Sequence, residues 1–111
     1  MKWENLFKRP HKELLPGALA AAFGGEAAMV NHVRLAAGTE VPEHAHPEEQ
    51  LTLVLAGRIL FELEGEAAEL GPGEAVWVPQ NARHRVRALE ESVVLDVFSP
   101  VRRDLLEKLG Q

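Results

Sequence analysis

Apolar residues occur in short runs along this chain, and glycine and proline separate the runs. Runs of roughly four to eight residues with turn residues between them are typical of β-strands. Arg58–Glu64, for example, places Ile59, Phe61 and Leu63 on one face of an extended segment. The expected strands are Ala27–Ala36, Gln50–Ala56, Arg58–Glu64, Ala67–Leu70, Ala75–Pro79, Arg83–Ala88 and Ser92–Phe98.

The two ends of the chain depart from this pattern. Met1–Leu15 is mixed and charged, and we expect an arm or a short helix whose apolar side chains pack on the body. Ser99 followed by Pro100 is typical of a helix N-cap and first helical position, so a helix is expected at about residues 100–109. Many short strands with one terminal helix predict an all-β sandwich or small barrel.

Composition restricts the class of protein. The 111 residues fit a single domain, which we place at residues 1–111. The net charge of −5 argues against a nucleic-acid partner, and no apolar stretch approaches the roughly 20 residues needed to cross a membrane. Cysteine is absent, which excludes disulfides and Cys-ligated zinc. The charged N-terminus lacks the apolar segment of a secretory signal, so a cytoplasmic location is expected.

Three histidines are the first candidates for chemistry. His44 and His46 are two positions apart, so on an extended strand both side chains point to the same side. His84 lies on a later strand, on the face opposite to a row of arginines. A lone histidine on an apolar face is usually a satisfied core residue, but beside an H-x-H pair metal ligation is the better interpretation. Imidazole suits divalent iron, nickel, copper and zinc, so these residues predict a metal site.

The residue that completes the site lies just after His46, where the sequence reads PEEQ. Glu48, Glu49 and Gln50 are all close enough in sequence to be ligands. Glu48 has the same parity as Gln50 but follows Pro47 in a turn, where a solvated surface charge is the simpler interpretation. Glu49 points to the opposite side of the strand from Gln50.

With these residues the chain resembles the cupin superfamily. The first cupin motif, G-x5-H-x-H-x3,4-E-x6-G, matches with glutamine in the acid position. The second, G-x5-P-x-G-x2-H-x3-N, matches in part, with Asn81 in place of the inner glycine and Ala88 in place of the asparagine. The matching positions are Gly38, His44, His46, Gln50 and Gly57, then Gly73, Pro79 and His84. The resemblance spans about residues 27–98. It implies a jelly-roll-like double-stranded β-helix barrel with a metal inside, held by His44, His46, Gln50 and His84.

Glutamine in the acid position changes the expected chemistry. A carboxylate ligand would leave a divalent site with net charge +1, whereas a neutral amide leaves +2, so the ion keeps more Lewis acidity and binds less tightly. The 2-His-1-carboxylate pattern of non-haem iron oxygenases is also missing. We therefore expect one divalent transition metal (nickel, iron, zinc, manganese or cobalt) that supports isomerisation or hydration rather than oxygen activation.

The segment DVFSPVRRDLL carries a second candidate cluster. Asp96 and Phe98 share one face of their strand, and an aspartate that faces the interior is destabilising by roughly several kcal/mol unless it is paired or functional. An ion pair with Arg102 or Arg103 is one interpretation. The other is a general acid/base whose pKa is raised by apolar walls and lowered by a nearby cation.

The same segment is similar to that of KdgF-type cupins, which linearise unsaturated uronates in pectin and alginate breakdown. These proteins combine a three-histidine-plus-glutamine site with D-x-F-x3-R, and Asp96, Phe98 and Arg102 occupy those places. The resemblance implies that Asp96 is catalytic, that Phe98 packs on the sugar ring and that Arg102 binds the uronate carboxylate. A guanidinium can hold a carboxylate through two hydrogen bonds, which supports the role of Arg102 independently.

We therefore expect a metal-dependent cupin that acts on a small sugar-like or acidic molecule, with ring opening of 4,5-unsaturated uronates as the specific hypothesis. The alternatives are a three-histidine iron dioxygenase and a non-catalytic cupin that binds a sugar or metabolite. An exposed sheet and the apolar arm favour a homodimer. His11 is expected to be exposed, His32 is kept out of the ligand set, and Trp77 is expected in the core rather than as a sugar platform.

Overall fold

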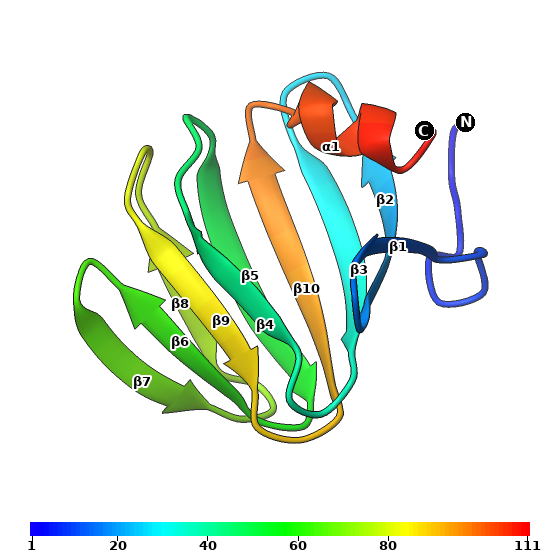
Figure 1. The fold of residues 1–111 in the computed structure, drawn as a ribbon. Coiled ribbons are helices and arrows are strands. Elements are labelled where there is room, and N and C mark those ends of the chain that lie inside the picture. Colours follow the sequence, from blue (N-terminus) through cyan, green and yellow to red (C-terminus); the bar gives the residue numbers. More distant parts are fainter.

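The structure, a computed structural model that describes residues 1–111, consists of two antiparallel β-sheets that face each other and one short helix (Figure 1). One sheet has six strands, in the order β1 (Lys12–Leu15), β2 (Ala18–Gly24), β3 (Met29–Leu35), β10 (Ser92–Ser99), β5 (Glu49–Ala56) and β8 (Ala75–Val78). The other has four, in the order β4 (Glu40–His44), β9 (His84–Ala88), β6 (Ile59–Leu63) and β7 (Glu66–Leu70). Helix α1 spans Arg103–Lys108. The all-β prediction with a short C-terminal helix is confirmed.

The register of β10 determines which side chains meet between the sheets, because β10 lies between β3 and β5. Asp96 is opposite Asn31 on β3 and Thr52 on β5, which makes a row of three polar residues across three strands. The next inward row toward the start of β10 is entirely apolar and consists of Val33, Val94 and Val54. The barrel interior is therefore apolar at one end and polar where Asp96 lies.

Two turns need backbone conformations that few residues adopt. Gly57, between β5 and β6, has a φ of 85°, and a Cβ there would collide with the Glu91 carbonyl oxygen and the Ser92 hydroxyl. Asn81 has a φ of 64°, and asparagine tolerates this left-handed region better than most residues. Asparagine therefore replaces the motif glycine at this position without loss of the turn. The backbone N–H of Asn81 donates to the His46 carbonyl at 2.9 Å, which connects this loop to the segment that carries His46.

Three details at the chain ends differ from the sequence-based expectations. Lys12–Leu15 is a strand that pairs with β2, so neither an arm nor a helix extends to Leu15. Ser99 is not an N-cap, because it ends β10 opposite Glu49 and its hydroxyl donates to the Ala27 carbonyl at 2.8 Å. The helix instead begins at Arg103, without a side-chain cap. This six-residue helix is too short to cross a membrane.

Candidate metal centre

The three histidines of the two motifs converge between the sheets. His44 is the last residue of β4, and His84, the first of β9, is its register partner. His46 lies in the connection between β4 and β5, not on a strand as the H-x-H spacing suggested. The possible ligand nitrogens all lie within 4.8 Å of one another, a group that could hold a metal ion.

Backbone carbonyls orient all three imidazole rings in the same way. Each Nδ1 lies 2.9–3.0 Å from a carbonyl oxygen two residues away, on Pro42, Glu48 and Ala82 in turn. Because a carbonyl only accepts, each Nδ1 carries the hydrogen and each Nε2 presents its lone pair. The buried His84 Nε2 has no hydrogen-bond partner at all. Such second-sphere contacts are the usual way of aiming histidine ligands at a metal.

The protonation of two of these rings favours ligation. Burial lowers the pKa of His84 to about 4. Burial also lowers the pKa of His46, and the positive charge of Arg102 lowers it further. Both rings are therefore neutral at pH 7, and neutral imidazole is the form that binds metals.

Gln50, the second residue of β5, points its amide oxygen at the histidines. Its Oε1 lies 2.9 Å from His46 Nε2, and its amide nitrogen donates to the Thr52 hydroxyl at 2.8 Å. Thr52 in turn donates to Asp96 Oδ1 at 2.6 Å. This chain of donors determines the amide orientation, because a reversed amide would turn its oxygen toward Thr52 and Asp96, where another acceptor is unfavourable.

The contact between Gln50 Oε1 and His46 Nε2 fits a shared cation. With the hydrogen of His46 on Nδ1, two lone pairs face each other at 2.9 Å. Two donor atoms that bind one ion at about 2.1 Å and at right angles lie about 3 Å apart. The unpartnered His84 Nε2, the aimed imidazoles and this pair of facing acceptors are together suited to a divalent metal.

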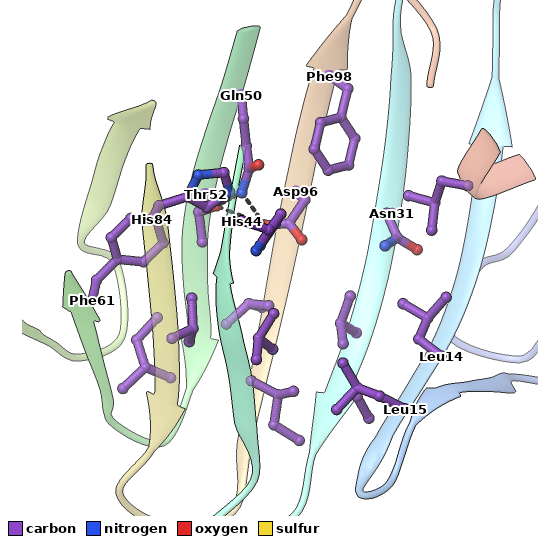
Figure 2. A pocket seen from close by; sticks show the side chains of 18 of the residues that line it. Leu14, Leu15, Asn31, His44, Gln50, Thr52, Phe61, His84, Asp96 and Phe98 are labelled. Atoms are coloured by element: carbon purple, nitrogen blue, oxygen red, sulfur yellow. Dashed lines mark hydrogen bonds between the residues drawn. The ribbon is translucent and has the colours of Figure 1, made fainter. Parts of the chain in front are cut away.

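Asp96 lines the same pocket as a partly buried carboxyl (Figure 2). Burial raises its pKa to about 6, although the Thr52 hydrogen bond and the charge of Arg102 act in the opposite direction. The ion pairs of Arg102 are with Asp104 at 2.9 Å and Glu48 at 3.9 Å, and not with Asp96. Asp96 is therefore held by hydrogen bonds and keeps a pKa suited to proton transfer near neutral pH.

Arg102 and Phe98 form a neighbouring wall of the pocket. The Arg102 guanidinium carbon lies 5.1 Å from the centre of the Phe98 ring, within the range of a cation–π contact. The buried Arg102 Nε has no hydrogen-bond partner. Phe98 also packs edge-on against His46, with ring centres 5.6 Å apart. A cation and an aromatic ring thus stand beside the histidines and Asp96.

A cavity of about 110 Å³ lies between the two sheets at this site. Most of its lining is apolar, and the polar side chains converge at one part of it: His44, His84, Gln50, Thr52, Asp96, Asn31 and Arg102. An apolar cavity with a few convergent polar groups is the usual form of a small-molecule site.

Sequence reasoning missed three polar residues of this site. Glu48, expected as a solvated charge, is only 14% exposed, and its carboxylate lies 3.6 Å from His46 Nδ1 and 3.9 Å from Arg102 Nε. Thr52 and Asn31 were not singled out, because nothing in their own strands marks them. Parity alone places both on inward faces, but their proximity to Asp96 depends on the strand order.

Three residues set aside earlier lie outside the pocket. His32 is buried on the outer face of β3, where its Nδ1 lies 2.8 Å from His11 Nε2 and its ring packs against Phe7. His11 is consequently half-buried, and the expectation of an exposed side chain is wrong. The expectation that Trp77 lies in the core is also wrong. Its side chain is 57% exposed on the outside of β8, and its indole N–H donates to the Glu49 carboxylate at 2.8 Å.

Comparison with known proteins agrees with this geometry. Residues 31–98 match the family model described as Cupin domain. Over 76 residues the chain is 40% identical to pectin degradation protein KdgF of Dickeya dadantii, covering 67% of this chain and 69% of that protein. It is 31% identical over 74 residues to the tetracenomycin polyketide synthase protein TcmJ of Streptomyces glaucescens, covering 66% of this chain and 47% of that protein.

A solved structure gives the same result for the fold. KdgF from a Halomonas species superimposes with a TM-score of 0.90 at 30% identity, covering 96% of this chain and 99% of that one. The similarity thus includes β1, β2 and α1 in addition to the segment that carries the two motifs. The chain belongs to the cupin family and is a KdgF-like member of it.

Proposed function

We propose that this protein is a metal-dependent enzyme that opens the ring of 4,5-unsaturated uronates. The observation that carries the proposal is the position of Asp96, which lines one pocket together with His44, His84, Gln50, Phe98 and Arg102, while His46 packs against Phe98. The KdgF relative is a pectin degradation protein, and pectin is a polymer of uronates, which supports a substrate of this class.

The reaction is an isomerisation in which one proton leaves and one arrives. The hydroxyl on C1 loses its proton, the bond from C1 to the ring oxygen breaks, and C1 becomes an aldehyde. The ring oxygen becomes the C5 ketone as the C4=C5 electron pair takes up a proton at C4. A divalent metal held by His44, His46, Gln50 and His84 would supply Lewis acidity to an oxygen of the sugar.

The side chains of the pocket would have separate roles in proton transfer and substrate binding. Asp96, with a pKa of about 6, can hold and release the proton that C4 receives. Thr52 donates to the same carboxyl at 2.6 Å and so fixes its orientation. Arg102 would bind the uronate carboxylate, and the ring of Phe98 would pack against the sugar.

Asp96→Asn tests this assignment, because asparagine keeps the shape and removes the titrating group. We expect the loss of C=C ultraviolet absorbance to slow by at least about a hundredfold, since general acid catalysis contributes roughly that much. The matched control is Glu66→Gln on the exposed strand β7, which should keep the wild-type rate. Equal rates for Asp96→Asn and wild type would remove Asp96 from the mechanism.

We further propose that two copies of the chain pair through the outer face of β5, β8 and β10. Leu51 and Trp77 are register partners there, and they are 50% and 57% exposed. Leu55 is also exposed on the same face, and Leu53 and Leu95 lie beside it. Adjacent exposed apolar side chains on one sheet face are typical of a protein–protein contact.

A further inference from the structure

Asn31 is a buried polar residue that the proposed reaction does not use. It lies in the middle of β3 and is 2% exposed. The neighbouring inward residues of this strand are apolar: Met29, Val33 and Leu35. The side chain nevertheless forms no hydrogen bond within the protein, and its buried Oδ1 has no partner. A buried amide oxygen without a partner destabilises the fold, so its presence indicates a ligand that would bond to it.

The position of Asn31 shows what kind of ligand would satisfy it. Asn31 is the register partner of Asp96, and Thr52 is the partner of Asp96 on the other side. Directly opposed residues of antiparallel strands have Cα atoms about 4.5–5.5 Å apart. Figure 2 shows Asn31 and Asp96 facing the same pocket, with Thr52 and His84 on the far side of Asp96. A molecule that contacts Asp96 therefore lies within reach of the Asn31 amide.

The hydrogen bonds among Gln50, Thr52 and Asp96 do not involve Asn31, so its amide can bond to a ligand. The Thr52 hydroxyl donates to Asp96, and Gln50 donates to Thr52, so these groups satisfy one another. The Asn31 amide has both an acceptor and a donor to offer, whereas a carboxylate ligand would use only the donor. A hydroxyl can accept from the NH₂ group or donate to the oxygen. The amide is thus suited to an uncharged, hydroxyl-bearing part of a ligand.

We propose that Asn31 determines specificity by binding a sugar hydroxyl on the side of Asp96 away from the histidines. This inference rests on the proposed function, because it names how the same site distinguishes a sugar from another carboxylate. A site with a buried amide discriminates against a ligand that lacks the hydroxyl, because the amide is then left unpaired.

The test uses two carboxylate probes with metal-reconstituted protein. Galacturonate carries ring hydroxyls, and tetrahydropyran-2-carboxylate has the ring and the carboxylate without them. In calorimetric titrations we expect wild-type protein to bind galacturonate at least about tenfold more tightly, since the Asn31 hydrogen bond alone contributes about that much. Asn31→Leu should reduce this preference by about tenfold, because only the hydrogen bond of the amide is lost. Asn5→Leu, a change of the same type in the exposed arm, should keep the wild-type preference.

Stability provides a second measurement that separates binding from folding. Since the amide has no partner in the protein, Asn31→Leu should melt at or above the wild-type temperature without ligand. An undiminished preference in Asn31→Leu, or wild-type protein without any preference, would overturn the proposal. If Asn31→Leu and Asn31→Ser both fail to fold, the amide serves the fold and the proposal is also wrong.

The outcomes also separate this inference from the proposed reaction. An Asn31-dependent preference without turnover of unsaturated uronate would remove the ring-opening reaction and leave the sugar subsite. Turnover of unsaturated uronate without the Asn31-dependent preference would remove the sugar subsite and leave the ring-opening reaction.

Discussion

At the scale of single residues, the orientation of one amide connects the two halves of the site. Gln50 directs its oxygen toward His46 and its nitrogen toward Thr52, which bonds to Asp96. A glutamate in this position could not donate to Thr52. It would also place a second negative charge beside the Asp96 carboxyl, because the Gln50 nitrogen lies 3.5 Å from Asp96 Oδ1. With a divalent ion bound, glutamine would therefore keep the site more positive, and it lets the Asp96 carboxyl ionise near neutral pH.

Gln50→Glu should consequently strengthen metal binding and slow the reaction. The added charge should tighten binding of a divalent ion by about tenfold or more, and the loss of Lewis acidity together with a raised Asp96 pKa should lower kcat by a similar factor. Competition with a chelating dye measures the affinity, and ultraviolet absorbance measures kcat. Gln80→Glu, at an exposed loop position, is the matched control. Unchanged affinity and kcat in Gln50→Glu would mean that ligand charge is not the reason for glutamine.

Sequence reasoning was most informative where local spacing carries the information. The spacing of the histidines predicted one metal site, the cupin resemblance added Gln50 to it, and period-2 parity placed Asp96 and Phe98 on one face. Glu48 was misjudged because its carboxylate folds back toward His46 and Arg102, which the turn sequence does not reveal.

At the scale of elements, the pattern of apolar residues predicted β3 and the strands from β5 to β10 closely, but it did not predict β4. It did not single out β2, whose sequence ALAAAFG has no polar alternation because both of its faces are largely buried. It did not predict strand order either. The contacts of Asp96 with Thr52 and its position beside Asn31 depend on β10 lying between β3 and β5, and these strands are far apart in sequence.

At this scale we also predict that the outer face of β5, β8 and β10 pairs two copies of the chain. Wild-type protein should sediment as a dimer at micromolar concentration, since stable dimers bury about 800 Å² per partner and this face exposes several large apolar side chains. Trp77→Glu places a charge on this face and should yield a monomer. Leu89→Glu, at an exposed leucine outside β5, β8 and β10, should remain dimeric. A monomeric wild type would rule out this interface.

At the scale of the whole molecule, the barrel brings together groups from several strands of both sheets. The four-stranded sheet supplies His44 and His84, and the six-stranded sheet supplies Gln50, Thr52, Asn31, Asp96 and Phe98. His46 and Arg102 come from the connections at the ends of strands. The site therefore exists only when the two sheets are packed, and family resemblance predicted this assembly better than any local pattern.

The most direct test of metal-dependent ring opening compares metal-stripped with metal-reconstituted protein on 4,5-unsaturated uronate. We expect the C=C absorbance to disappear rapidly only with the reconstituted protein, which should bind one divalent ion per chain. The product should be a 4-deoxy-5-keto open chain by nuclear magnetic resonance. Decay no faster than in buffer with every metal tested, or equal rates for the stripped and reconstituted protein, would contradict the proposed function.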